Sequence, residues 1–193
     1  MTTTDLITQI ADAHTRDAEL TQAGPTGDDE RWTIVLERDY DHPREDVWAC
    51  WTEPDRLARW LGAIDRQPAV GETVRMGMAP DGEATQDVQL QECTPQDSLT
   101  VRWGGFGEGE SQVRATFSDA PGSPGTRVRL EHSGLRARGA WSYGAGWGEV
   151  MHLAALAVAD PGFDAADSDV DRGSLEEGLQ AYWDELVPRG RVG

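Results

Sequence analysis

The chain has 193 residues and a formal net charge of −18 at pH 7, and its 17 basic residues are all arginine. This charge disfavours binding to nucleic acid or to an anionic membrane surface, because both require clustered cations. The length suits one domain with extensions, since a chain of this size buries a core without disulfide or metal support.

The two cysteines, Cys50 and Cys93, are too few and too far apart for a disulfide framework or a CxxC metal site. No window approaches 18 consecutive apolar residues, and the first residues lack the basic and apolar regions of a signal peptide. We therefore expect a cytoplasmic protein that neither spans nor binds a membrane.

The first 30 residues form an acidic extension with seven acids and one arginine. Within residues 5–20 the apolar side chains recur at helical spacing, which predicts a short amphipathic helix. The sequence AGPTGDDE at 23–30 combines glycine, proline and charge and is typical of a linker.

The domain is predicted to begin at residue 31 with a strand, because RWTIVLERDY at 31–40 alternates apolar and polar residues. The following stretch, HPREDVWACWTEPDRLARWLG, predicts two short helices with Pro43 and Pro54 in their first turns and Thr52 as the second N-cap. Each presents one apolar face, which contains Trp48 and Trp51 in the first and Trp60 in the second.

Residues 70–133 change to a period of two and give five successive strand candidates separated by short turns. Short connections imply antiparallel neighbours, so these strands should form a meander. Its buried face is expected to carry these residues: Val74, Met76, Val88, Leu90, Leu99, Val101, Trp103, Val113, Phe117, Val128 and Leu130.

A long apolar helix is predicted over 140–160, where Trp147, Val150, Met151, Ala154 and Val158 form one stripe. Residues 161–193 follow as an acidic linker and a final amphipathic helix at 174–186, which opens with a capping box. A helix of this length is marginal alone, so we expect it to dock on its own domain. The alternatives are that it acts as a lid or forms a homodimer contact.

The predicted class is α+β, with a curved antiparallel sheet gripping one long helix. This order resembles the START/SRPBCC superfamily with its helix-grip fold, and within it the AHSA1-like branch named after activators of a heat-shock chaperone ATPase. Four segments carry the resemblance across about residues 32–160: RDYDHPREDVWACWTEPDRLARWLG, VGETVRMGM, GTRVRLEHSGL and GAGWGEVMHLAAL. Each alone is a packing pattern, but the four in this order are specific.

The resemblance implies an apolar cavity between the sheet and the long helix, with the paired short helices over one end and their tryptophans walling or filling it. It implies binding of a hydrophobic or aromatic small molecule as the function. The alternatives are a cyclase or dehydratase acting on polyketide-like substrates in the same cavity, and a co-regulator that contacts a chaperone. We expect these residues to bind the ligand, with core packing as the alternative role of each: Trp60, Met76, Trp103, His132, Tyr143, Trp147 and Met151.

Two histidines and one acid are the polar candidates. His132 has inward parity on the last strand, where it could bond a ligand or act as a general acid or base, or else cap a neighbouring group. His152 lies off the main apolar stripe, so we expect it at the surface, in contact with solvent or with the linker, and not in the cavity lining. Glu92 would face inward if its strand runs unbroken from Val88.

No motif predicts a metal, a cofactor or a catalytic nucleophile. The chain lacks HExxH, and DSDVDRGSLEEG has Arg172 where a calcium loop needs its glycine. GGFGEGE at 104–110 lies between two strands, so it is a hairpin loop and not a phosphate cradle. We therefore assign no catalytic residue, no metal and no cofactor from the sequence.

Overall fold

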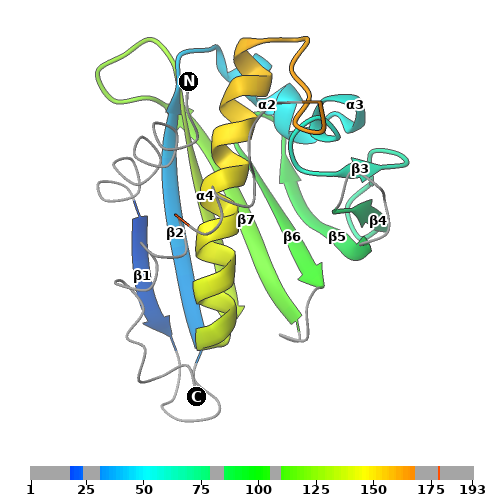
Figure 1. Ribbon diagram of the computed structural model, residues 1–193, viewed down its shortest axis with the longest axis vertical. Coiled ribbons are helices and arrows are strands. Elements are labelled where there is room, and N and C mark those ends of the chain that lie inside the picture. The colour runs from blue at the N-terminus through cyan, green and yellow to red at the C-terminus, as the bar shows by residue number, and fades with distance from the viewer. Residues whose placement is uncertain (1–17, 24–30, 79–84, 105–109, 168–177, 179–193) are drawn as a thin grey trace.

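The computed structural model describes residues 18–23, 31–78, 85–104, 110–167 and 178, which form a single antiparallel sheet curved around a long helix, with two short helices beside it (Figure 1). The eight strands lie in the order β1-β2-β8-β7-β6-β5-β4-β3. Their bounds are β1 Ala18–Ala23, β2 Arg31–Tyr40, β3 Ala63–Ile64, β4 Thr73–Gly77, β5 Thr85–Thr94, β6 Ser98–Gly104, β7 Glu110–Asp119 and β8 Thr126–Leu135. The helices are α2 Arg44–Thr52, α3 Pro54–Leu57 and α4 Ala137–Ala159. The predicted α+β helix-grip fold is confirmed.

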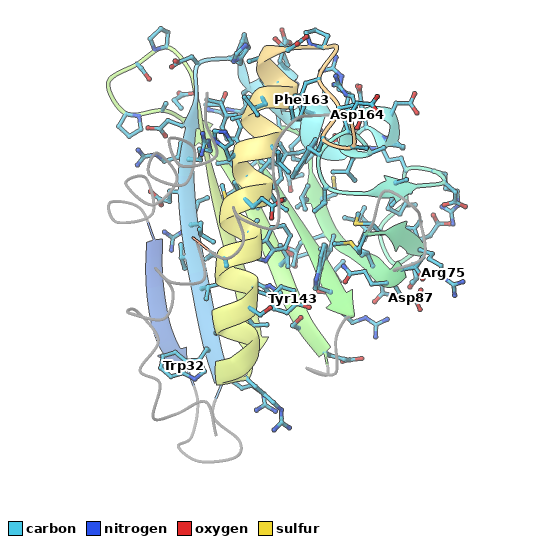
Figure 2. All side chains as sticks on the ribbon, viewed as in Figure 1. Trp32, Arg75, Asp87, Tyr143, Phe163 and Asp164 are labelled. Atoms are coloured by element: carbon cyan, nitrogen blue, oxygen red, sulfur yellow. The ribbon has the colours of Figure 1, made fainter. Side chains whose placement is uncertain are left out.

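The two faces of the sheet differ as the alternation predicts. The inner face carries apolar side chains, among which Val128 and Leu130 are fully buried. The outer face carries paired charges: Arg127 bonds both carboxylate oxygens of Asp39 at 2.7 and 2.8 Å, and Arg129 contacts Glu37 at 2.9 Å. Arg75 and Asp87 form a similar pair on β4 and β5, at 3.7 Å (Figure 2). Exposed pairs contribute little stability, so the inner face holds the fold together.

Strand β5 contains a register shift between Leu90 and Glu92. A bulge adds one residue to one strand and therefore reverses which side chains face inward beyond it. The expectation that Glu92 faces inward is wrong: its side chain is 71% exposed and lies 3.9 Å from Arg114. The inward position is taken by Cys93 instead.

Helix α4 lies across the concave face, with Leu153 and Ala154 fully buried against the sheet (Figure 1). Two polar contacts join it to β2: the Tyr40 hydroxyl donates to the carbonyl of Met151 at 3.3 Å, and Arg38 Nη2 donates to His152 Nδ1 at 3.0 Å. The prediction that His152 is a surface residue is wrong, because it is only 6% exposed. The apolar faces of this helix are broad enough to bury residues beyond the main stripe.

Helices α2 and α3 pack their tryptophans together. The ring centroids of Trp51 and Trp60 are 4.8 Å apart, and Trp60 Nε1 donates to the carbonyl of Cys50 at 3.0 Å. Thr52 does not cap α3 as predicted: its hydroxyl bonds the carbonyl of Trp48 in the preceding turn, and Glu53 is the N-cap residue. After α3 the chain passes close to β4 at Gly62, where an added Cβ would lie 2.1 Å from the carbonyl oxygen of Gly77.

The extensions are described only in part. Residues 18–20, predicted as the end of a helix, belong to β1, which pairs antiparallel with β2. This pairing gives hydrogen-bond partners to an otherwise open sheet edge, which outweighs local helix preference. Residues 161–167, predicted as linker, fold back so that Ala165 N–H bonds the carbonyl of Arg59 at 2.8 Å; Phe163 and Asp164 lie in this segment (Figure 2). The remainder of the predicted helix at 5–20 and, apart from Gly178, the helix at 174–186 lie outside the described residues.

Candidate functional site

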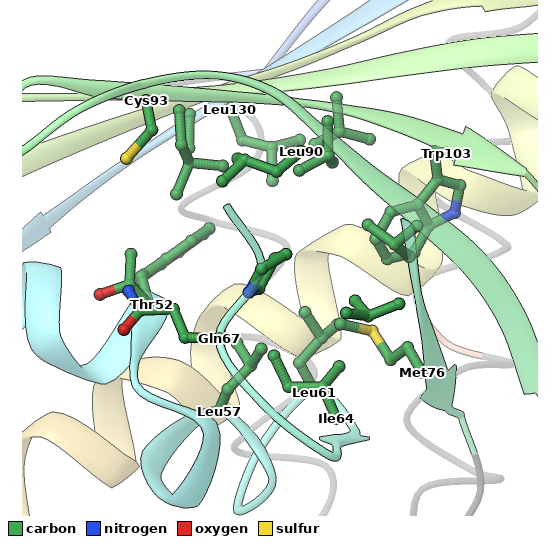
Figure 3. A pocket seen from close by; sticks show the side chains of 18 of the residues that line it. Thr52, Leu57, Leu61, Ile64, Gln67, Met76, Leu90, Cys93, Trp103 and Leu130 are labelled. Atoms are coloured by element: carbon green, nitrogen blue, oxygen red, sulfur yellow. The ribbon is translucent and has the colours of Figure 1, made fainter. Parts of the chain in front are cut away.

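An apolar cavity lies between the inner face of the sheet and the segment that contains α2, α3 and β3 (Figure 3). The sheet wall comprises Val74, Met76, Val88, Leu90, Cys93, Leu99, Val101, Trp103, Val113, Ala115 and Leu130. The opposite wall comprises Trp51, Thr52, Leu57, Leu61, Ile64, Gln67 and Pro68. Among the lining residues that the structure describes, Trp147 alone comes from helix α4, so the cavity lies under the paired helices more than under the long helix.

The cavity is small and uncharged. Its volume is ≈110 Å³, and none of the described residues that line it carries a formal charge at neutral pH. An apolar cavity of about 150 Å³ holds a benzene molecule and stays dry when empty, so this space matches one ring or a short hydrocarbon chain. The polar lining side chains are Thr52, Gln67 and Cys93.

The cavity has two distinct ends. Figure 3 shows Thr52 and Cys93 at one end and Trp103 at the other. Gln67 and Cys93 are exposed, whereas Trp103 is only 3% exposed. The cavity therefore meets solvent on the side of Thr52 and Cys93 and is closed by Trp103.

The structure brings only some of the expected ligand-binding residues to this cavity. Met76, Trp103 and Trp147 line it. Trp60 packs against Trp51, on the side away from the cavity. Met151, on α4, is buried in the core and does not appear among the lining residues described. His132 and Tyr143 lie behind the wall formed by Trp103 and Trp147, with their rings 4.5 Å apart. Ligand contact by any of the seven stays a prediction.

Several residues that line the cavity were not among the expected ligand-binding residues. The tryptophans of the paired helices were expected to wall or fill the cavity, and Trp51 lines it, although it was not among the expected ligand-binding residues. Leu57 and Leu61 carried an apolar periodicity that could have placed them on the cavity. Cys93 was hidden by the bulge, which no sequence pattern marked. Gln67 and Pro68 lie in the connection between β3 and β4, where periodicity gives no orientation.

His132 is the central residue of a chain of hydrogen bonds behind the cavity. Trp147 Nε1 donates to His132 Nδ1 at 2.9 Å, and His132 Nε2 lies 2.9 Å from Ser111 Oγ. Ser111 Oγ in turn donates to the carbonyl of Trp103 at 2.9 Å. Because an indole N–H can only donate, Nδ1 is the acceptor and Nε2 carries the proton. Both ring nitrogens therefore have partners within the protein.

The environment keeps this imidazole neutral. His132 is fully buried, and its burial lowers its pKa to about 3. A neutral ring with both nitrogens occupied has neither a free lone pair nor a displaceable proton for a substrate. Of the lining residues described here, Cys93 alone is titratable in the ordinary range, and burial raises the pKa of its thiol. The arrangement is built for packing and shape more than for proton transfer.

No group of three or more His, Cys, Asp or Glu side chains in residues with described positions could hold a metal ion. None of the described helices is long and apolar enough to cross a membrane.

Comparison with solved structures supports the same architecture. CalU16 from Micromonospora echinospora superposes with a TM-score of 0.68 at 20% identity, over 88% of this chain and 98% of that protein. MLL2253 from Mesorhizobium loti matches at 27% identity with a TM-score of 0.57, over 66% of this chain and 96% of that protein. DynU16, described as a protein of the dynemicin biosynthetic locus, matches at 23% identity with a TM-score of 0.61, over 70% of this chain and 49% of that one.

A search of curated proteins finds no match. The family model for Activator of Hsp90 ATPase homolog 1-like proteins, by contrast, matches residues 41–158, from the start of the paired helices to the end of α4. This span is more than half of the chain and includes most of the cavity wall. The chain belongs to the AHSA1-like family of the SRPBCC superfamily.

Proposed function

We propose that this domain binds a neutral, hydrophobic or aromatic small molecule in the cavity between the sheet and the α2–α3 segment. The observation that carries the proposal is the cavity itself: an uncharged space of ≈110 Å³ whose wall is made almost wholly of apolar side chains. Ligand pockets are concave and mostly apolar with a few polar groups, and this one has Thr52 and Gln67 at its mouth.

The same lining selects against charged ligands. A carboxylate or ammonium group inside the cavity would lose its hydration, and no opposite charge on the described lining would compensate for it. A ligand with a charged end would have to keep that end at the mouth near Cys93. We therefore expect neutral single-ring or short-chain molecules to bind more tightly than their carboxylate analogues.

The enzymatic alternative receives less support. The cyclase or dehydratase hypothesis needs a general acid or base in contact with the cavity, and His132 lies behind the wall with both nitrogens engaged. The match to DynU16, from a biosynthetic locus, agrees with a small-molecule role but does not separate binding from catalysis. The family description names a chaperone ATPase activator, so a protein partner is the alternative in a different class.

Thermal unfolding tests the proposal. The protein would be unfolded with single-ring aromatics, short-chain alcohols, fatty acids and sterols, each beside its charged analogue where one exists. A ligand at about one hundred times its Kd adds about 2.7 kcal/mol to the free energy of unfolding, which is a rise in Tm of about 5–10 °C for a chain of this size. We expect this rise with neutral single-ring compounds.

Two matched variants identify the site of binding. Val101→Phe places a ring in the cavity and should abolish the shift, whereas Ser118→Phe adds the same ring on the exposed outer face of β7 and should keep it. A shift that survives Val101→Phe would place binding elsewhere. With no shift from any class, the binding proposal fails, and affinity capture of a protein partner becomes the next test.

A further inference from the structure

The cavity follows strand β6 from its open end to its closed end. Leu99, Val101 and Trp103 alternate on the inner face of this strand, and all three line the cavity. Leu99 pairs with Cys93 at the mouth, and Figure 3 shows Trp103 at the opposite end. A strand rises about 3.3 Å per residue, so the Cα atoms of Leu99 and Trp103 are about 13 Å apart. Trp103 therefore limits how far a ligand that enters at the mouth can extend along the sheet.

A second tryptophan completes the closed end from the side of the long helix. Trp147 on α4 also lines the cavity, and its ring lies against that of Trp103, with the centroids 5.1 Å apart and the planes inclined at 54°. Trp103 and Trp147 are only 3% and 4% exposed. Because one side chain projects from the sheet and the other from α4, the pair bridges these two layers. It separates the cavity under the paired helices from the rest of the interface between the sheet and α4.

Buried hydrogen bonds hold both members of this tryptophan pair. Trp147 Nε1 donates to His132 Nδ1 at 2.9 Å, and Ser111 Oγ, 2.9 Å from His132 Nε2, donates to the carbonyl of Trp103. His132 is fully buried and is not among the described lining residues, so it lies behind the pair. If the ring of Trp147 turned aside for a longer ligand, the buried Nδ1 of His132 would lose its donor, which costs free energy. The pair should therefore stay in place when a ligand binds.

We infer that Trp103 and Trp147 determine the length of ligand that the cavity can bury: the apolar part of a ligand extends inward only as far as this pair, and any further part stays at the mouth. The inference rests on the proposed function, because it identifies the residues that limit which hydrophobic molecules the cavity holds. The ligand class that follows is a neutral molecule with a short apolar body. Methylene groups that remain outside the cavity stay in contact with water and add no affinity.

A series of straight-chain alcohols from 1-butanol to 1-octanol measures the length that the cavity buries. Each alcohol would be titrated into ¹⁵N-labelled protein, with the Kd taken from the shifts of the amide resonances. Burial of one more methylene group lowers the Kd about fourfold. In the wild type we expect this decrease along the shorter alcohols, followed by a constant Kd once the chain reaches the two tryptophans.

Variants on the two sides of the closed end test which residues set this limit. Trp103→Leu removes most of the ring and should move the plateau to a longer alcohol, with a Kd for 1-octanol at least about fourfold lower than in the wild type. Trp48→Leu is the matched control: Trp48 packs against Phe117 with ring centroids 5.1 Å apart and is not among the described lining residues, so the plateau should not move. Trp147→Phe puts a smaller ring on the helix side and provides the same test if Trp103→Leu does not fold.

The outcomes separate this inference from the proposed function. If the alcohols bind but the Kd falls through the whole series in the wild type, or if the plateau is unmoved in Trp103→Leu and Trp147→Phe, the pair does not limit ligand length, while the cavity remains a binding site. An equal displacement of the plateau in Trp48→Leu also overturns the inference. If no alcohol binds the wild type, the inference fails, and the thermal-unfolding series decides whether the proposed function fails with it. A plateau that moves to longer alcohols only when Trp103 or Trp147 is replaced supports the inference.

Discussion

The indole N–H of Trp147 on α4 donates a 2.9 Å hydrogen bond to Nδ1 of His132 on β8. This bond joins the gripping helix to the sheet directly behind the cavity, where the rings of Trp147 and Trp103 lie 5.1 Å apart. His132 therefore acts on the cavity through another residue: it fixes the ring of Trp147, which forms part of the wall.

Ser111→Ala should destabilise the protein by about 1–3 kcal/mol, because it leaves the buried Nε2–H of His132 without an acceptor. Equilibrium urea unfolding measures this difference. Ser118→Ala, on the exposed face of the same strand, is the control and should change the free energy of unfolding by less than about 0.5 kcal/mol. Equal effects of the two variants would mean that the hydrogen-bond chain does not stabilise the fold.

Stability should fall with acid below the ordinary histidine pKa. Burial lowers the pKa of His132 to about 3, and burial together with the charge of Arg38 lowers that of His152 to about 4. Between pH 6.5 and 4 the unfolded chain takes up protons that the native protein does not, so the stability contributed by each neutral histidine is complete above about pH 6.5 and is lost as the pH falls. Each contributes a slope of up to about 1.4 kcal/mol per pH unit.

His152→Gln separates this effect from the titration of the many carboxylates. Glutamine stays neutral, and its amide oxygen can still accept from Arg38. Urea unfolding between pH 4.5 and 7.5 should show a shallower slope for the variant than for the wild type, by up to about 1.4 kcal/mol per pH unit. Parallel curves for the two proteins would show that His152 is not held neutral by the native structure.

The architecture could be predicted because it depends on periodicity. Along each strand, apolar residues such as Val74, Val88, Val101 and Val113 alternate with polar ones, which predicted the inner face of the sheet. The apolar stripe that contains Trp147 and Met151 predicted the gripping helix. These patterns are local, and burial of an apolar face is the main force that acts on them.

The errors have non-local causes. The bulge after Leu90 exchanged Glu92 for Cys93 in the cavity wall, and the strand at Ala18–Ala23 formed because β2 offers it an edge. His152 is buried where α4 packs on β2, and its hydrogen-bond partner Arg38 lies 114 positions away in the sequence. The volume of the cavity depends on the distance between the sheet and helices α2 and α3. Many tertiary contacts set this distance, and the periodicity of the sequence does not predict it.

Gly62→Ala should destabilise the fold, because the new methyl group would meet the carbonyl oxygen of Gly77 at 2.1 Å in backbone that has no flexible side chain to move. Overpacking of this kind costs about 1–3 kcal/mol. Gly146→Ala is the matched control: it lies within α4, and outside the local backbone of that helix no atom lies within 4 Å of the added Cβ, so it should stabilise the protein by about 0.5–1 kcal/mol. Thermal unfolding of both variants gives the comparison, and a neutral Gly62→Ala would show that the β3–β4 contact is looser than the structure indicates.

The two cysteines should react with thiol reagents at very different rates. Cys50 is fully buried, and burial raises its pKa to about 11, whereas Cys93 is exposed at the mouth of the cavity. Native protein should therefore give one fast-reacting thiol per chain with a disulfide reagent, and Cys93→Ser should remove it, while unfolded protein gives two. Because the thiol of Cys93 is partly buried, which raises its pKa, the rate should still increase as the pH is raised above 8, as more of the reactive thiolate forms. Two fast thiols in the native state, or one that remains in Cys93→Ser, would contradict the packing of Cys50 and the inward turn of β5 after its bulge. If the cavity holds ligand, saturation with a bound aromatic should slow the reaction of Cys93 and leave that of unfolded protein unchanged.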